Sequence, residues 1–254
     1  MRAISNNKVV GENLNVFKQH IDGFVGKLRA NPTKNRQKIL EVCHVGKFLT
    51  ILGYGSIERL SEHPDFIINI DGQSIGLEHH VVLNSSYKEK EGYFQNIFSI
   101  AETLIQSDDE IPNFHSNCWL KDDLTFRLNE KSEKIDEIVM VVKHFIVHGT
   151  LLPNSVIAEM DRQPHDRKSI SPNFGSWWQA QITSEILMSA ISKKEQKIPN
   201  YIVHSSLHQW LLLVIGGLDN SSYEVMTDID FEIVSRFDKI FLLEDFRGRL
   251  FQLK

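Results

Sequence analysis

Apolar and polar residues alternate in two short runs, 66–70 and 75–82, and this period of two predicts a pair of β-strands. Asp71-Gly72 separates the runs, and this dipeptide is a strong signal for a two-residue hairpin turn. If these two residues alone form the loop, Ile70 pairs with Gln73. The turn therefore fixes the register of every other pair in the hairpin.

The remaining apolar residues recur at helical spacing or form short buried runs. Pro32 and Gly53 mark the start and the end of one helix, as these residue types often do. The segment 153–172 is rich in turn formers and charges, which predicts a long loop containing one short strand. The predicted helices cover 13–28, 34–52, 88–106, 131–148 and 179–197, and the further strands cover 118–128, 155–160, 209–216, 239–243 and 250–253.

The composition is that of a soluble globular protein, with 254 residues, 41% hydrophobic and 24% charged, and this length can form one enlarged domain over 1–254. The longest apolar run, Trp210 to Leu218, is too short to span a bilayer, and no secretory signal is visible in residues 1–8. The two cysteines, Cys43 and Cys118, both have apolar neighbours, which favours a reducing cytoplasm over a disulfide scaffold.

The net charge of −5 excludes a protein that attracts nucleic acid over its whole surface, so the distribution of charge matters more. The segment 24–40 holds five basic residues and no acid, and a second basic cluster at 162–168 precedes aromatic residues at 174–178. Such clusters can neutralise phosphates, and the aromatic rings can stack on bases. A solvated surface with a buried Trp177–Trp178 pair is the alternative for both. The candidate nucleic-acid contacts are Arg29, Lys34, Arg36, Arg167 and Lys168.

The hairpin register places Asp65 directly opposite Glu78. Cross-strand Cβ atoms are only about 4.5–5.5 Å apart, so two carboxylates there repel each other unless a cation or a shared proton lies between them. Hard oxygen ligands of this kind suit Mg²⁺ or Mn²⁺. His80 lies two residues after Glu78 and hence on the same face. In the alternative interpretation Asp65 only begins a strand and Glu78 is solvated, but apolar neighbours on both faces favour a covered strand.

The pattern Pro64-Asp65, a hairpin, Glu78, one further residue and then a polar group resembles the metal-binding motif of the PD-(D/E)XK nuclease superfamily. This resemblance implies a restriction-endonuclease-like αβββαβ core, an α/β fold with a mixed central sheet flanked by helices. It also implies that Asp65 and Glu78 are catalytic metal ligands for Mg²⁺ or Mn²⁺. Residues 1–31 are then an N-terminal helical extension, residues 84–178 hold inserted helices and loops, and 118–128 is the third core strand.

The chain departs from the family motif at His80, where the family has a lysine that places and activates the attacking water. Three explanations are open: His80 acts itself, a lysine from a later helix acts in its place, or the site has lost turnover. Lys194 and Lys197 are the candidate replacements, although cations also simply cap a helix C-terminus. His80 is slightly preferred because it already shares a strand face with Glu78. Glu41 is a candidate additional metal ligand, with Glu58 and Glu62 as rivals.

The function that we expect is therefore metal-dependent hydrolysis of nucleic-acid phosphodiesters, with DNA the preferred substrate, in restriction, repair or defence. The alternative is a catalytically inactive module of the same fold that binds nucleic acid or a partner protein. Action as a homodimer or with a partner subunit is compatible with both. Two other patterns carry less weight: His204 and His208 at zinc-like spacing without a third ligand, and Cys43 beside His44 on a helix.

Overall fold

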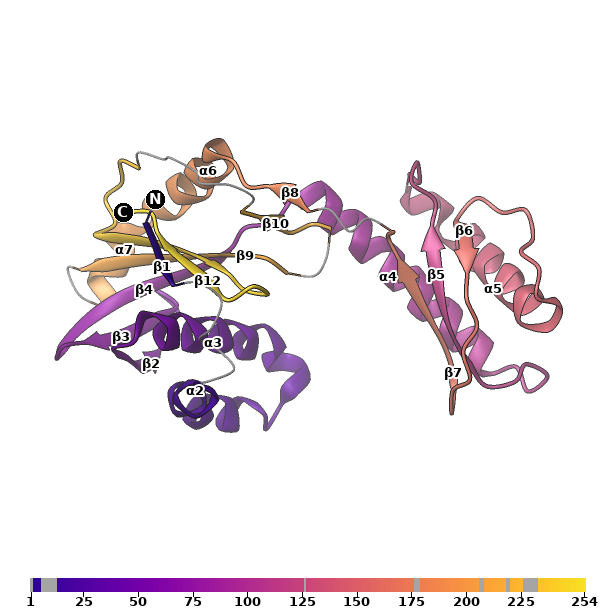
Figure 1. Cartoon of the computed structure of the whole chain (residues 1–254), viewed down its shortest axis with the longest axis horizontal. Coiled ribbons are helices and arrows are strands. Elements are labelled where there is room, and N and C mark those ends of the chain that lie inside the picture. The colour runs from indigo at the N-terminus through magenta and orange to yellow at the C-terminus, as the bar shows by residue number, and fades with distance from the viewer. Residues whose placement is uncertain are drawn as a thin grey trace. The chain divides into compact units, whose positions relative to one another are not determined.

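The computed structural model divides the chain into two compact units (Figure 1). The first combines Met1–Leu83 with Gln179–Lys254, and the second is Asn84–Trp178. The second unit has the same bounds as the insertion expected at 84–178, so the single domain expected over 1–254 contains two compact bodies. The structure describes residues 2–5, 13–125, 127–175, 179–205, 208–217, 220–225 and 233–254.

A seven-stranded mixed sheet forms the centre of the first unit, in the order β1-β12-β11-β9-β4-β3-β2. The neighbouring pairs β4–β9 and β9–β11 are parallel, and the other neighbours are antiparallel. The α/β class and the mixed sheet flanked by helices were predicted from the sequence and are confirmed at this level. The strands are β1 (Arg2–Ser5), β2 (Ser56–Leu60), β3 (Phe66–Ile70), β4 (Gln73–Val81), β9 (Gln209–Ile215), β11 (Lys239–Glu244) and β12 (Arg249–Gln252).

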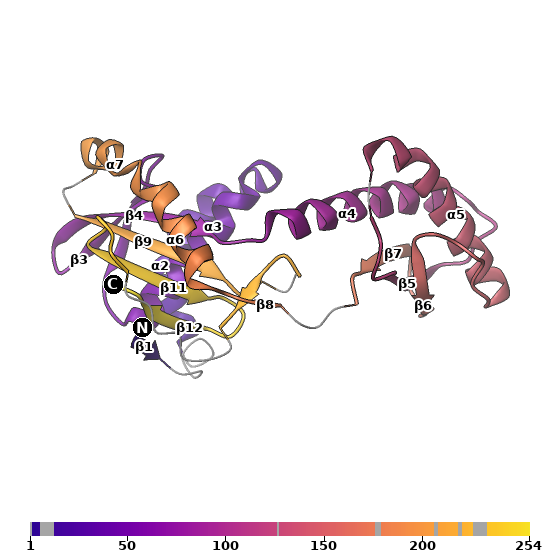
Figure 2. The ribbon, with the colours of Figure 1, turned by 90° about the horizontal axis from the view of Figure 1, so that it is seen from above.

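Two pairs of helices cover the two faces of this sheet (Figures 1 and 2). The helices α2 (Leu14–Leu28) and α3 (Pro32–Leu52) pack on one face, while α6 (Ser184–Glu195) and α7 (Ile198–His204) pack on the other. Because side chains alternate along a strand, Leu77 of β4 faces α3, and Glu78 faces α6. The site residues of β4 are thus divided between two faces.

The hairpin has the register predicted from the sequence. Ile70 pairs with Gln73, and the ladder continues to Phe66 opposite Leu77. Asp71 and Gly72 have φ angles of 52° and 83°, the positive values that a type I′ turn requires at both central positions. Continued by one step, this register would bring Asp65 opposite Glu78.

The third strand of this antiparallel meander is β2, which precedes the hairpin, so the prediction of 118–128 as the third core strand is wrong. Residues in that range contribute to β5 (Phe114–Leu120) of the second unit, and Phe126 lies outside the described residues. The strand β2 lies at the edge of the sheet, and Ile57 is its only buried residue. An edge strand with one buried side chain gives little alternation, which is why the sequence pattern did not identify it as a strand.

The predicted helix 179–197 is shorter and is followed by a second helix. Thr183 accepts a hydrogen bond from Ile186 N and caps α6, while the preceding residues form β8 (Ala180–Gln181), which pairs with β10 (Tyr223–Glu224). Pro199 lies in the first turn of this second helix, α7, where its missing N–H has no cost.

The second unit is a three-stranded sheet with two helices packed around one apolar core. The predicted helices 88–106 and 131–148 are confirmed. The predicted loop 153–172 contains the short strand expected at 155–160, observed as β6, and also the beginning of a second strand, β7. No helix in the described ranges has the length and apolar character needed to cross a membrane. The elements are α4 (Ser85–Gln106), β5, η1 (Leu128–Glu130), α5 (Lys131–His148), β6 (Ile157–Met160) and β7 (Lys168–Asn173).

Candidate active site

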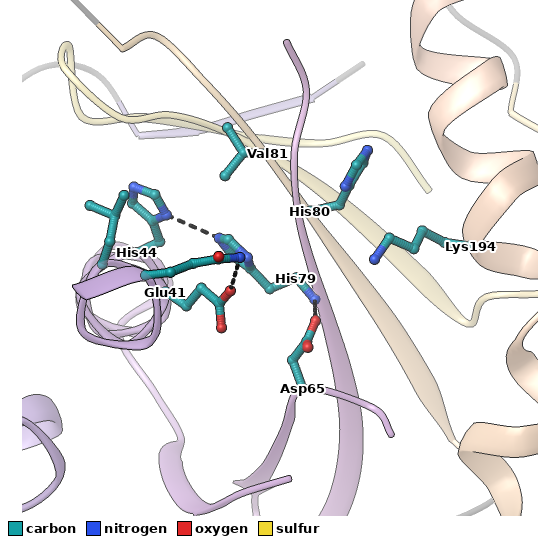
Figure 3. A pocket seen from close by; sticks show the side chains of 9 residues that line it. Glu41, His44, Asp65, His79, His80, Val81 and Lys194 are labelled. Carbon is teal, nitrogen blue, oxygen red and sulfur yellow. Dashed lines mark hydrogen bonds between the residues drawn. The ribbon is translucent and has the colours of Figure 1, made fainter. Parts of the chain in front are cut away.

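An open pocket of about 270 Å³ lies in the first unit, beside the residue that precedes β3 and the last residues of β4 (Figure 3). Side chains from both faces of the sheet reach this pocket. His44 and Glu41 lie on one side of β4, and His80 and Lys194 lie on the other. The lining residues are Gln37, Leu40, Glu41 and His44 of α3, Asp65, His79, His80 and Val81 of the sheet, and Lys194 of α6.

Asp65 directly precedes β3, and its carboxylate ends the ladder between β3 and β4. The Asp65 Oδ2 atom accepts a hydrogen bond of 2.9 Å from His79 N. Burial first, and the nearby Glu78 carboxylate second, raise the pKa of Asp65 from 3.8 to about 6. The surroundings of Asp65 therefore disfavour its charged form near neutral pH.

Lys194 forms an ion pair with Glu78, and its Nζ lies 2.6 Å from Glu78 Oε1. The Glu78 side chain is only 5% exposed and the Lys194 side chain 18%, so this pair is largely removed from water. Lys194, and not Glu78, lines the pocket. Of the two lysines proposed from the sequence, the structure thus brings Lys194 to the carboxylates, whereas Lys197 is exposed just before α7.

The position of Lys194 follows from the apolar stripe of its helix. Leu187, Ala190 and Ile191 are the buried residues of α6. Lys194 is three residues after Ile191 and four after Ala190, so it continues the stripe by one turn toward the sheet. Lys193 points away from this stripe and is exposed. This spacing was the signal that could have selected Lys194 from the sequence.

His80 shares the α6 face with Glu78, as predicted, and lines the pocket. Burial first, and the Lys194 ammonium second, lower the pKa of His80 to about 4. The imidazole is therefore neutral at pH 7 and can accept a hydrogen bond there. It does not supply the positive charge that a motif lysine would bring.

A buried pair of histidines, which sequence reasoning missed, lines the α3 side of the pocket. His44 Nδ1 and His79 Nε2 are 3.0 Å apart, and both residues are 5% exposed. On the other side of His44, its Nε2 lies 3.9 Å from Asp245 Oδ2, and Asp245 is paired with Lys47. Burial lowers the pKa of both histidines, so the pair is a neutral hydrogen-bonded contact that joins α3 to β4. The available signal was a histidine within the apolar stripe of α3.

The carboxylates fit a small divalent cation better than a metal with a full protein cage. Among the described residues, no group of three or more His, Cys, Asp or Glu side chains is arranged to hold a metal ion. Mg²⁺ needs no such group, because it usually takes one or two carboxylates and keeps water or phosphate oxygens at its other positions. Asp65 and Glu78 would supply the two carboxylates. Glu78 is the second-largest cause, after burial, of the raised pKa of Asp65, so the two carboxylates repel each other.

The other acidic and zinc-like candidates are not grouped with this pair. Glu41 lines the pocket, but its oxygens bind Lys38 at 3.0 Å and Gln37 at 3.1 Å. Glu58 lies on β2 and accepts a hydrogen bond from Ser74. Glu62 is an exposed residue between β2 and β3. His204 ends α7 and His208 lies beyond it, so the helical spacing proposed for zinc is not realised.

The two basic clusters differ in their surroundings. Arg29, Lys34 and Arg36 are exposed at the junction of α2 and α3, and Gln37, the next residue of α3, lines the pocket. Lys168 is half-buried, and its Nζ donates to the carbonyl oxygens of Gln106 and Asp108 at the end of α4, a structural capping role.

Arg167 is exposed, but it belongs to a unit of opposite charge. Residues 84–178 hold 10 basic and 15 acidic residues, whereas the rest of the chain holds 18 of each, so the whole net charge of −5 resides in the second unit. A strongly acidic unit disfavours phosphate contacts. Trp177 and Trp178, expected as stacking partners, lie outside the described residues.

Comparison with known proteins returned no relative: no protein-family model, no curated protein and no solved structure matches this chain. The function of the site therefore has to follow from its own residues.

Proposed function

We propose that this protein is a Mg²⁺- or Mn²⁺-dependent nuclease with a restriction-endonuclease-like core. The order of elements in the first unit supports this proposal: α3 is followed by the meander β2-β3-β4, then by α6, α7 and β9, which is parallel to β4. This is an αβββαβ order when the second unit is treated as an insertion between β4 and α6. Asp65 and Glu78 occupy the positions of the two motif acids within that order.

The observation that carries the proposal is the 2.6 Å contact between Lys194 and Glu78. The chain lacks the motif lysine, yet an ammonium group from a helix 116 residues away in sequence reaches the acid to which that lysine would be adjacent. Two carboxylates and one lysine are thereby assembled next to an open pocket. His80 is the fourth polar group at the same place.

Each residue has a role that its surroundings allow. Asp65 and Glu78 would hold the cation, which when bound supplies a lowered pKa for a coordinated water and neutralises charge on the scissile phosphate. Lys194 keeps a positive charge where a phosphate oxygen would bear increasing negative charge. Neutral His80 can accept a hydrogen bond from the attacking water and orient it.

Purified protein incubated with plasmid DNA and Mg²⁺ or Mn²⁺ tests the proposal. We expect cleavage with either metal, no cleavage with EDTA, and loss of cleavage in Glu78→Gln, which keeps the size of the side chain. Asp22→Asn on the exposed surface of α2 is the matched control and should cleave like the wild type. If neither DNA nor RNA is cleaved with any metal tried, the proposed nuclease activity is contradicted.

A binding module without turnover is the second candidate, and the same ion pair supports it. Lys194 already neutralises Glu78, and Glu78 does not line the pocket. A protein that retained the fold but not the reaction would have this arrangement. Binding of DNA that is unchanged by EDTA, together with absent cleavage, would select this candidate.

The basic residues beside the pocket give a separate prediction. Changing Arg29, Lys34 and Arg36 together to Glu should weaken binding to DNA of unrelated sequences by a similar factor, because phosphate contacts carry no sequence information. The slope of log affinity against log salt should fall by about 1 for each phosphate that the variant no longer neutralises. Fluorescence anisotropy at several salt concentrations measures both quantities. Lys34→Glu alone should also lower the slope. Lys18→Glu, near the start of α2, is the control for this single variant, and equal slopes in the two would exclude this surface.

A further inference from the structure

Tyr201 of α7 is fully buried, with 0% exposure, in the apolar cluster between the α6–α7 layer and the sheet. Its hydroxyl has no hydrogen-bond partner among the described residues. The hydroxyl nevertheless lies close to Glu78: Leu211 of the same cluster is the β9 residue paired with Glu78, and burial first, then the negative charge of Glu78 and a contact with its carboxylate, raise the pKa of the phenol. A polar group is therefore directed at the candidate metal ligand from inside the protein.

Stability alone does not explain a tyrosine at this position. A buried hydroxyl without a partner costs about 1–3 kcal/mol relative to a group that needs none. Phenylalanine would fill the same space and remove that cost. The hydroxyl should therefore have a partner in another state of the site.

Glu78 is the partner available. One of its oxygens, Oε1, is held by Lys194 from α6. If Lys194 turned to a phosphate oxygen, as the proposed function requires, Glu78 would lose the ammonium while its carboxylate would have to keep one orientation. Ligand carboxylates are commonly held by such outer hydrogen bonds, and removal of one typically costs 10- to 100-fold in metal affinity.

We propose, resting on the nuclease function above, that Tyr201 is a positioning residue whose hydroxyl donates a hydrogen bond to the Glu78 carboxylate and orients it as a cation ligand. Glu78 is then held from two helices, by Lys194 of α6 in the metal-free protein and by Tyr201 of α7 in the metal-bound protein. Sequence analysis did not assign Tyr201 to the site, because the contact depends on how α7 packs over β4 and β9.

Tyr201→Phe, which removes one oxygen atom, separates this role from simple packing. The two measurements are the affinity for Mg²⁺ by titration calorimetry and the melting temperature of the metal-free protein. We expect the affinity to fall about 10-fold or more, while the metal-free melting temperature stays the same or rises. Tyr93→Phe is the matched control: its hydroxyl donates to Arg127 O at 3.2 Å in the second unit, so that variant should have a lower melting temperature and keep its Mg²⁺ affinity.

Each outcome decides the matter. Wild-type Mg²⁺ affinity in Tyr201→Phe would overturn the proposal, and so would a reduced affinity accompanied by a lowered metal-free melting temperature, since that is the signature of damaged packing. Absence of Mg²⁺ binding by the wild type would overturn both this inference and the metal-dependent function. If Tyr201→Phe binds Mg²⁺ more weakly but the wild type does not cleave DNA, the positioning role of Tyr201 is supported and only the nuclease activity is contradicted.

Discussion

Replacing Lys194 with glutamine should lower the rate of DNA cleavage by about 10²-fold or more, the usual scale for a positioned catalytic group. Glutamine keeps a donor that can reach Glu78, so Glu78 is not left buried without a partner. The positive charge beside the scissile phosphate is what the variant lacks. Mg²⁺ affinity should stay equal or increase, because the ammonium that competes for Glu78 Oε1 is gone. Single-turnover cleavage and titration calorimetry measure the two effects.

Two further variants decide between lysine and histidine. Lys193→Gln changes the exposed neighbour of Lys194 and should cleave at the wild-type rate. His80→Ala should lower the cleavage rate less than Lys194→Gln does, because His80 is neutral at pH 7 and does not supply the positive charge. Sequence reasoning alone slightly favoured His80. That preference would be restored by full activity in Lys194→Gln together with inactivity in His80→Ala.

Local rules predicted the part of the site that lies in the hairpin. A two-residue turn and a period of two fix the register, so the pairing from Ile70 opposite Gln73 to Phe66 opposite Leu77 followed from residues 65–78 without any tertiary information. The opposition of Asp65 and Glu78 is an extension of the same register. The raised pKa of Asp65, caused in part by Glu78, agrees with the repulsion deduced for the pair.

The rest of the site depends on contacts between elements that are distant in sequence. The apolar stripe of α6 distinguishes Lys194 from its lysine neighbours, but only the packing of α6 on the sheet brings Lys194 to Glu78. His44 and His79 meet only because α3 packs on the opposite face of β4. The strand β2 was missed for a different reason: an edge strand buries one side chain, and its pairing with β3, not its own pattern, makes it a strand.

Replacing Asp65 with asparagine should stabilise the metal-free protein at neutral pH while abolishing cleavage. In the folded protein the pKa of Asp65 is raised from 3.8 to about 6, chiefly by burial and then by Glu78. Below the unfolded value the carboxyl is protonated in both states and costs nothing. As the pH rises from about 4 to 6 the unfolded chain releases the proton more readily, so the folded state loses stability, and above about 6 the loss is complete.

The pKa difference corresponds to roughly 3 kcal/mol, which in a protein of this size is on the order of a 5–10 °C rise in melting temperature for Asp65→Asn at pH 8. Asparagine can still accept the hydrogen bond from His79 N, so the end of the ladder is kept. Calorimetry in EDTA at pH 8, 6 and 4.5 should show the gain shrinking as the pH falls, with Asp22→Asn unchanged throughout.

Added Mg²⁺ should make the wild type more stable than Asp65→Asn, the reverse of the order in EDTA. A cation bound to Asp65 and Glu78 favours the charged carboxylates and stabilises the folded wild type by mass action. Asp65→Asn lacks one of these charges and should gain little. Two results would contradict this: Asp65→Asn less stable than the wild type in EDTA at pH 8, or a rise in its melting temperature with Mg²⁺ as large as that of the wild type. Either would show that Asp65 stabilises the pairing of β3 and β4 and does not bind a metal ion.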